Sequence, residues 1–220
     1  MLIRKRLFAW MYHYLLSGRG HPDLDDPFTR EVRVPLLEQA QGSVLEIGAG
    51  DGLNLPLYPP GIRLTLLEPN PYLRRYLRRA CAASGLDCLE VVDGVGEALP
   101  FPDAHFDTVV VVHVLCSVRS PAQVLSEVRR VLRPGGRFLF LEHVSAEPQS
   151  GVYRVQRAIN PVWKAVGDGC HLTRDTGAAI RAAGFDRVQI TAFKGSLPAV
   201  VSPHISGVAW LDSRPAAQTM

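Results

Sequence analysis

A short glycine-rich segment has the residue spacing that most clearly suggests chemistry. Residues 44–52 read VLEIGAGDG, so an apolar run leads into Gly48, Gly50 and Gly52. Glycines in such a turn let the backbone approach a ligand closely, and the amides that follow lie at a helix N-terminus. The dinucleotide fingerprint is GxGxxG, whereas this segment is GxGxG with Leu53 at the position of the third glycine. The segment therefore predicts a nucleoside ligand other than a dinucleotide.

Two acidic residues flank this loop and indicate which class of nucleoside it binds. Glu46 precedes the glycines, where its negative charge would repel a pyrophosphate but attract an ammonium or sulfonium group. Glu68 lies 20 residues after Gly48, where nucleotide-binding α/β folds place an acid that accepts the ribose hydroxyls. The alternative for Glu68 is a surface acid at the start of the next helix. Together the two acids favour a cationic nucleoside.

Alternating strands and helices must position these residues. Helix N-caps are expected at Asn70, Ser120 and Thr173, the first two followed by proline. The alternation predicts an α/β fold, with a Rossmann-like, doubly wound, mostly parallel sheet and helices on both faces. Strands are expected at 43–48, 63–68, 89–92, 107–112, 137–142, 189–193 and 205–211, and helices at 29–40, from 70, from 120 and at 173–183.

Composition is that of an ordinary globular protein. Hydrophobic residues make up 47% of the chain, charged residues make up 20%, and the net charge is +3. Such mild basicity predicts no nucleic-acid partner. None of the four cysteines forms a CxxC pair, so no metal site is expected, and they are interpreted as free thiols in the cytoplasm.

The chain is expected to divide into three parts. Residues 1–40 would form an N-terminal helical cap and 41–211 the main domain, with a helical insertion at about 146–166. Residues 212–220 would be a flexible tail. The apolar run at 7–16 is too short to span a bilayer and predicts a helix lying over the domain. The alternative is weak peripheral contact between this helix and a membrane surface.

Several motifs together resemble those of class I S-adenosylmethionine-dependent methyltransferases. They are EIGAGDG at 46–52, EPN at 68–70, GEALPFPD at 96–103, FD at 106–107 and LRPGG at 132–136. A second set resembles the methyltransferase-like seven family, whose members are alkyl-thiol S-methyltransferases. That set comprises YPPG at 58–61, VLCSV at 114–118, FLEHV at 140–144, DGCHLTR at 168–174 and PHI at 203–205.

The resemblance implies S-adenosyl-L-methionine as the methyl donor and S-adenosyl-L-homocysteine as the product. It implies a small apolar acceptor, with a thiol as the leading candidate. The alternatives are a quinone or phenol, a lipid amine, or a cofactor-binding protein without catalysis. The oligomeric state is left open.

The same resemblance assigns cofactor contacts to specific residues. Glu46 would face the methionine end of the cofactor, Glu68 would bind the ribose, and His113 would line the pocket near the methionine moiety. The glycine-loop residues assigned to cofactor contact are Gly48, Ala49, Gly50 and Gly52. The residues assigned to the adenine are Pro69, Gly96 and Glu97. Asp51 departs from the family pattern, since threonine is common there.

Methyl transfer is an in-line displacement at an activated sulfonium methyl, so the enzyme mainly aligns the reacting groups. A thiol has a pKa of about 8.5, and a modest nearby base yields enough thiolate. The catalytic candidates are His143, His204, Cys116 and Asp168, with Cys170 and His171 also considered. The alternatives are a histidine bonded to backbone, cysteines packed as small apolar side chains, and an aspartate in an ion pair or cap.

Overall fold

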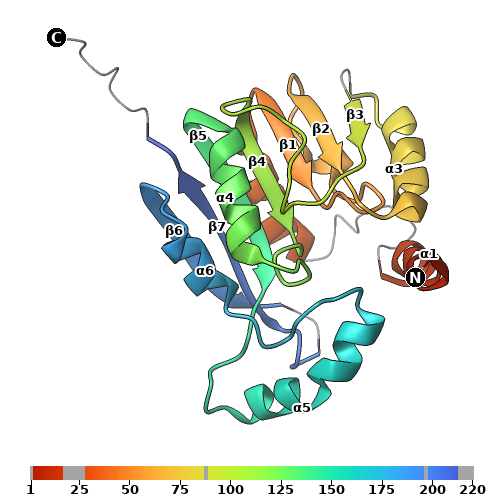
Figure 1. The fold of residues 1–220 in the computed structure, drawn as a ribbon, viewed down its shortest axis with the longest axis vertical. Coiled ribbons are helices and arrows are strands. Elements are labelled where there is room, and N and C mark those ends of the chain that lie inside the picture. Colours follow the sequence, from red (N-terminus) through yellow and green to blue (C-terminus); the bar gives the residue numbers. More distant parts are fainter. Residues whose placement is uncertain (1, 17–27, 87–88, 196–197, 213–220) are drawn as a thin grey trace.

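A seven-stranded sheet forms the centre of the computed structural model, which describes residues 2–16, 28–86, 89–195 and 198–212. The strand order is β3-β2-β1-β4-β5-β7-β6, and β7 runs antiparallel to both of its neighbours. This arrangement confirms the expected mostly parallel α/β sheet (Figure 1). The strands are β1 (Ser43–Ile47), β2 (Arg63–Leu67), β3 (Leu89–Val92), β4 (Phe106–Val112), β5 (Leu132–His143), β6 (Arg187–Lys194) and β7 (Pro203–Trp210).

Helices cover both faces of the sheet. On one face α4 (Pro121–Val131) and α6 (Thr176–Ala182) pack on side chains such as Val109. On the other face α2 (Val34–Leu37) and α3 (Pro71–Ala83) pack on side chains such as Val110. Neighbouring valines of β4 thus point to opposite, fully buried faces, as expected for a central parallel strand.

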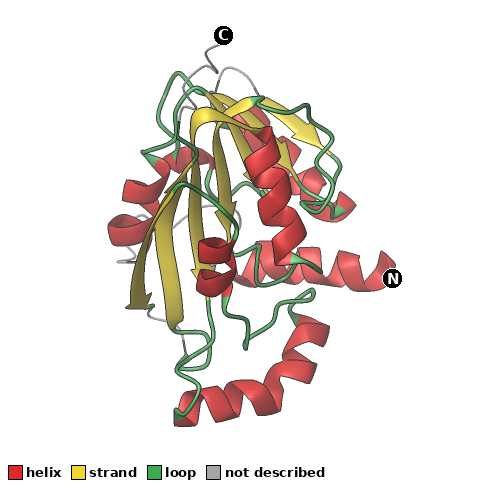
Figure 2. Ribbon diagram, turned by 60° about the vertical axis from the view of Figure 1, so that its left-hand side comes forward, coloured by secondary structure: helices red, strands yellow, loops and turns green. Residues whose placement is uncertain are grey.

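The remaining helical segments are at the edges of this core. Helix α1 (Leu2–Met11) continues into η1 (Tyr12–Leu16), η2 (Thr29–Arg33) leads into α2, η3 (Leu55–Leu57) follows the glycine loop, and α5 (Gly151–Val166) follows β5. Figures 1 and 2 both place α1 and α5 near the edge where the parallel strands end. These two helices therefore border the edge at which α/β folds bind ligands.

Local signals set two of the helix starts as expected. The Asn70 side chain accepts a hydrogen bond from Tyr72 N, and Ser120 does the same for Gln123 N. The expected cap at Thr173 is wrong. Asp175 caps α6 instead by accepting from Ala178 N at 2.9 Å, so the helix begins at Thr176.

Within the described residues, no helix is both long and apolar enough to cross a membrane. Of the tail expected at 212–220, only Asp212 belongs to the described part of the chain.

Candidate active site

A cavity of about 570 Å³ opens at the carboxyl edge of β1, β2 and β4. Its volume suits a nucleoside-sized ligand. Six parts of the chain that are distant in sequence form its wall. They are α1 and η1 with Lys5, Phe8 and Tyr12, the glycine loop with Gly48 and Gly50, the end of β2 with Glu68 and Pro69, the loop with Val95, Gly96 and Glu97, and the segments with His113, Val114, Ser117, Gly167 and Asp168.

Most of the residues assigned to cofactor binding meet at this cavity. Gly48, Gly50, Glu68, Pro69, Gly96, Glu97 and His113 all line it, as does the catalytic candidate Asp168. Ala49 and Gly52 belong to the same loop without lining the wall. Glu46, Cys116, His143 and His204 are buried behind it.

The glycine loop needs glycine at its two cavity-lining positions. Gly48 and Gly50 have φ of 71° and 60°, in the left-handed region. A Cβ on Gly48 would come within 2.6 Å of Val114, and one on Gly50 within 3.3 Å of the Tyr12 ring. The backbone therefore forms a cradle that a side chain would fill, which fits close approach of the expected cofactor.

Glu68 holds this loop against the start of α3. One carboxylate oxygen accepts from Gly50 N at 3.0 Å, and the other accepts from Asn70 N at 2.8 Å. Burial raises the pKa of Glu68 to about 7, although these two hydrogen bonds lower it. Each oxygen has a further lone pair for a ribose hydroxyl. The ribose role and the helix-start role expected as alternatives are therefore compatible.

Glu46 lies behind the loop rather than on the cavity wall. Its oxygens accept hydrogen bonds from Asn54 Nδ2 at 2.7 Å and from the Tyr58 hydroxyl at 2.9 Å. Burial raises the pKa of Glu46 to about 7. In this arrangement Glu46 can affect a sulfonium through its charge but not through direct contact.

The start of the chain closes one side of the cavity. Tyr12 is directed at Gly50, and burial raises the Tyr12 pKa to about 12. His13 Nδ1 lies 2.8 Å from an oxygen of Asp51, and the His13 ring stacks on Tyr76 with centroids 3.9 Å apart. Asp51, the departure from the family pattern, thus anchors the N-terminal helix over the glycine loop.

A buried carboxylate that sequence analysis did not single out shapes the opposite wall. Glu142 is fully buried at the end of β5. One of its oxygens accepts from Val114 N and Leu115 N at 2.7 and 2.8 Å, and the other accepts from Cys116 N at 3.2 Å. These bonds fix the turn that begins at His113, whose φ is 58°. The sequence signal was a charge inside the apolar run FLFLEH, because a buried charge requires partners.

Three imidazoles cluster at the cavity wall, where His113 lines the cavity and His143 and His204 lie behind it. The His204 ring centroid is 5.3 Å from that of His113 and 6.4 Å from that of His143. His204 Nδ1 lies 2.9 Å from the Ser202 carbonyl, to which only a protonated nitrogen can donate. The neutral ring therefore keeps an acceptor lone pair on Nε2, a buried atom with no hydrogen-bond partner among the described residues. Burial lowers the pKa of His204, so the neutral form predominates near neutral pH.

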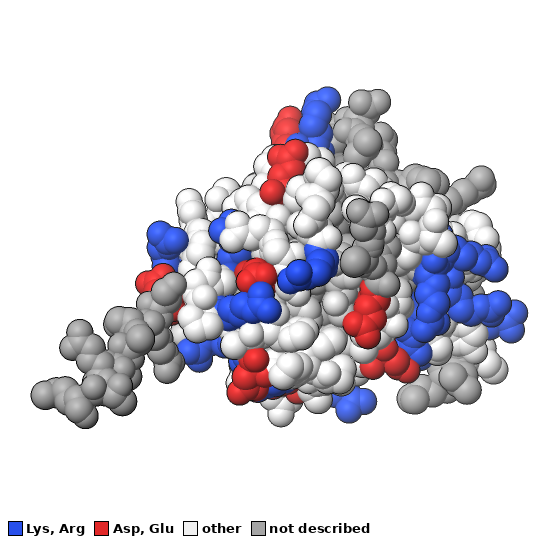
Figure 3. Space-filling model, turned by 90° about the horizontal axis from the view of Figure 1, so that it is seen from above, with Lys and Arg blue, Asp and Glu red and all other residues white. Residues whose placement is uncertain are grey.

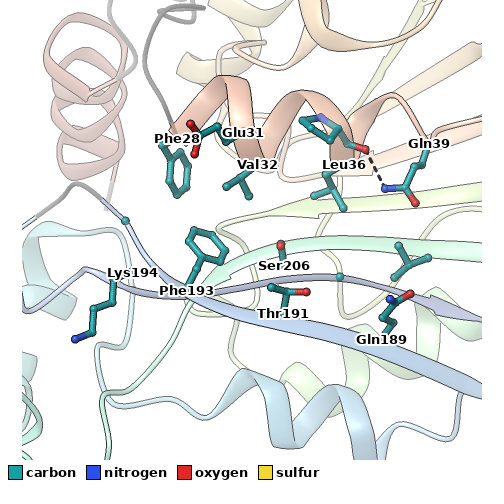
Figure 4. A pocket seen from close by; sticks show the side chains of 14 residues that line it. Phe28, Glu31, Val32, Leu36, Gln39, Gln189, Thr191, Phe193, Lys194 and Ser206 are labelled. Atoms are coloured by element: carbon teal, nitrogen blue, oxygen red, sulfur yellow. Dashed lines mark hydrogen bonds between the residues drawn. The ribbon is translucent and has the colours of Figure 1, made fainter.

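A second cavity, of about 690 Å³, lies between the helices η2 and α2 and the strands β6 and β7. Phe28 and Phe193 face each other at one end of it, and Gln39 lies toward the other end (Figure 4). The His204 ring centroid is 5.2 Å from that of Phe28 and 5.6 Å from that of Phe193. Since His113 lines the first cavity and Phe28 and Phe193 line the second, the His204 ring packs against lining residues of both.

The His143 side chain contacts a cysteine. Its Nε2 lies 3.1 Å from Cys170 Sγ. The ligand atoms of Cys116, His143 and Cys170 all lie within 4.8 Å of one another. These residues come from three separate stretches, so the spacing of cysteines in the sequence gave no sign of the cluster.

Comparisons with known proteins agree with this fold and site. A family model described as a methyltransferase domain matches residues 45–140. Human thiol S-methyltransferase TMT1B is 43% identical over 178 residues, which cover 79% of this chain and 73% of the human protein. The rat protein of the same name is 43% identical and covers 76% of this chain and 70% of its own length.

A solved structure from Thermotoga maritima, described as an S-adenosylmethionine-dependent methyltransferase and a possible histamine N-methyltransferase, has a TM-score of 0.68. It is 19% identical and covers 96% of this chain and all of its own. At that identity the likeness concerns the fold alone.

Proposed function

Since this chain belongs to the thiol S-methyltransferase family and is an S-adenosylmethionine-dependent enzyme, we propose that it methylates small apolar thiols. The observation that carries this proposal is the buried Nε2 of His204, which has no hydrogen-bond partner among the described residues, on a ring that packs against lining residues of both cavities. Its substrate is a small molecule, and the cofactor brings a methyl group already activated on a sulfonium.

The first cavity is assigned to the cofactor. The backbone at Gly48 and Gly50 would pack against it, and Glu68 would accept its ribose hydroxyls. Pro69, Gly96 and Glu97 would surround the adenine, and His113 would face the methionine end. In this assignment Ala49 and Gly52 shape the loop, and Glu46 contributes charge from behind it.

The Phe28 and Phe193 end of the second cavity is assigned to the acceptor. Two aromatic rings offer an apolar surface, and His204 lies against both of them. A thiol held there would give its proton to His204 Nε2 as its sulfur attacks the methyl carbon. His204 is a suitable proton acceptor because it is largely neutral at physiological pH.

The other three catalytic candidates receive different roles. Asp168 lines the cofactor cavity, so it would contact the cofactor or acceptor directly. His143 and Cys116 belong to the cysteine cluster, and His143 Nε2 is already bonded there. His204 is therefore the proposed proton acceptor for the substrate.

The test is a methyl-transfer assay on the purified full chain with S-adenosyl-L-methionine. Aliphatic and aromatic thiols should be methylated, while matched phenols, quinols and lipid amines should react far more slowly. Methylation of a quinol or lipid amine without methylation of any thiol would refute the thiol proposal but leave the methyltransferase identification intact. No transfer at all, despite cofactor binding, would indicate a non-catalytic cofactor-binding protein.

Weak contact with a membrane surface is a further part of the proposal. Ile3, Leu7, Trp10 and Tyr14 expose 86%, 64%, 51% and 43% of their surface at helical spacing. Basic residues at 4–6 adjoin this face and could meet lipid phosphates.

We propose no nucleic-acid partner and an action in the cytoplasm. Figure 3 shows Lys and Arg gathered mainly at one edge, with mixed charges elsewhere on the visible face. Helix α3 lies on that side in Figure 1 and exposes Arg75, Arg78 and Arg79. Such a short group on one helix, whose interleaved Tyr76 ring already stacks on His13, is typical of a solvated helix face.

A further inference from the structure

The cluster of Cys116, His143 and Cys170 brings two thiols within reach of each other. Cys116 lies in the turn after β4, and Cys170 follows α5. The His171 amide donates to the Cys116 carbonyl at 2.9 Å, which ties the two backbones together beside the cysteines. The two sulfur atoms themselves lie within 4.8 Å of each other, so a small movement of the side chains would bring them to bonding distance.

The pKa values of the two thiols are shifted in opposite directions. Hydrogen bonding from the Cys116 thiol lowers the pKa of Cys170, and the neighbouring His143 lowers it further, against the effect of burial. The hydrogen bond to Cys170, together with burial, raises the pKa of Cys116 well above its usual value. Burial alone would lower the pKa of His143, but its bond with Cys170 raises it. These directions, together with the contact between Cys170 and His143, favour Cys170 as the thiolate and Cys116 as the thiol.

The more acidic thiol, that of Cys170, is also the more exposed of the two. Cys170 is half-buried, whereas Cys116 exposes 2% of its surface. A small reagent would therefore meet the thiolate Cys170 first and the buried Cys116 afterwards. That order is what a nucleophilic and a resolving cysteine require.

We propose that Cys116 and Cys170 form a redox-active dithiol that exchanges with small disulfides. The substrate class is a low-molecular-weight disulfide, R–S–S–R. This activity is distinct from methyl transfer and does not depend on the identity of the methyl acceptor.

The exchange proceeds in two displacements. The Cys170 thiolate attacks one sulfur of R–S–S–R, so a Cys170–S–S–R bond forms while the original S–S bond breaks and R–S⁻ leaves. Cys116 then loses its proton and attacks the Cys170 sulfur, forming the Cys116–Cys170 disulfide and releasing the second thiolate, which takes up that proton. The disulfide gains two electrons and the protein dithiol loses two. A low-molecular-weight thiol reverses both steps and restores the dithiol.

The position of the pair links it to the cofactor cavity. Ser117 and Asp168 both line that cavity, one and two residues from the cysteines. The new disulfide would join these two walls, and the thiols released by exchange would emerge beside the cavity.

A bound metal ion is the competing interpretation of the cluster. Tetrahedral zinc has bonds of about 2.3 Å to sulfur and about 2.0 Å to nitrogen, which separates those ligand atoms by about 3.5 Å. The 3.1 Å between Cys170 Sγ and His143 Nε2 is shorter and corresponds to a direct hydrogen bond. The observed geometry thus favours the thiolate–imidazolium pair.

The test uses the full-length reduced protein without cofactor and a chromogenic aromatic disulfide as the probe. The wild-type protein should release both halves of the probe in a rapid phase, and its mass should fall by two hydrogens. Peptide mapping should then find Cys116 joined to Cys170. Cys170→Ser should slow the rapid phase at least tenfold. Cys116→Ser should release one half only and retain the other as a mixed disulfide visible by mass.

Cys81→Ser is the matched control, because Cys81 is half-buried and burial raises its pKa to about 11. This variant should keep the rapid phase. Oxidised wild-type protein that contains no Cys116–Cys170 bond overturns the proposal, and this measurement does not depend on how any variant folds. Stoichiometric zinc in the purified protein, with rapid probe release only after chelation, would also overturn it in favour of a metal site.

Discussion

At the scale of single residues, Glu68 has both a structural role and a proposed role in cofactor binding. It bonds the glycine loop and the start of α3 while lining the cofactor cavity. Replacing Glu68 by alanine should weaken S-adenosylhomocysteine binding by about 1.5–3 kcal/mol, the range for hydrogen bonds to a charged group. Calorimetry gives the dissociation constant, and Glu90→Ala on the exposed part of β3 is the control. An unchanged constant would limit Glu68 to a structural role.

The same carboxyl group predicts a pH dependence of cofactor affinity. Its pKa in the free protein is about 7, so it is ionised above that pH and protonated below it. A carboxylate accepts hydroxyl hydrogen bonds more strongly than a carboxylic acid does. Affinity for S-adenosylhomocysteine should therefore fall as the pH drops from 8 to 6. Glu68→Gln, which cannot ionise, should show a shallower slope, and equal slopes would contradict the assignment.

His204 is the residue on which the chemical proposal rests. His204→Gln should lower turnover of a thiol by about 10²-fold, the lower end for a lost general base, with cofactor affinity within about twofold of wild type. Because burial lowers the pKa of His204, the wild-type rate should decline only below about pH 6.5.

Without this base the rate should follow acceptor ionisation and keep rising toward about pH 8.5. His105→Gln is the control, since His105 is exposed at the start of β4. A turnover in His204→Gln equal to that of the control would remove His204 from the mechanism.

At the scale of elements, the N-terminal helix acts as a wall of the cofactor cavity. Tyr12→Ala should raise the dissociation constant of S-adenosylhomocysteine about tenfold, because it removes an aromatic ring beside Gly50 that lines the cavity. Tyr14→Ala, on an exposed position of the same turn, is the matched control. Equal constants for the two variants would show that this helix does not contribute to cofactor binding.

The turn at 113–117 depends on Glu142. Burial raises the pKa of Glu142 to about 7, above its unfolded value of 4.5. Between pH 4.5 and about pH 7 the folded state therefore binds more protons than the unfolded state does. The free energy of unfolding falls as the pH rises through this range.

Compared with Glu142→Gln, the wild-type free energy of unfolding should decline by on the order of 2–3 kcal/mol between pH 5 and pH 8. Urea unfolding at both pH values measures this difference. The parallel contributions of Glu46 and Glu68 occur in both proteins and cancel. A constant difference between the two proteins would show that Glu142 remains ionised.

At the scale of the whole molecule, the exposed apolar face of α1 predicts reversible contact with membranes. The protein should co-sediment with anionic phosphatidylserine vesicles and much less with neutral phosphatidylcholine vesicles. Leu7→Ser should reduce the bound fraction, since Leu7 exposes 64% of its surface beside basic residues. Equal binding of Leu7→Ser and wild type would assign the α1 face another role.

The fold was predictable because its signals are local. An apolar β-branched run specified β4, and an Asn-Pro pair specified the start of α3. The cofactor loop was predictable for the same reason, since its glycines and Glu46 lie within a few residues. The start of α6 was mistaken because Thr173 and Asp175 are both good caps, and the bond to Ala178 N decides between them.

The sequence by itself thus determined the sheet, the glycine loop and the kind of cofactor, all of which depend on short-range spacing and on the sign of one charge. Only the tertiary structure decided which side chains meet at and behind the cavity wall. His113, His143 and His204 come from the ends of different strands, and Cys170 comes from the loop after α5. Their protonation states depend on burial and on a few hydrogen bonds. Such contacts arise only when the parallel strands end at one edge and α5 returns to it, and a linear spacing cannot reveal them.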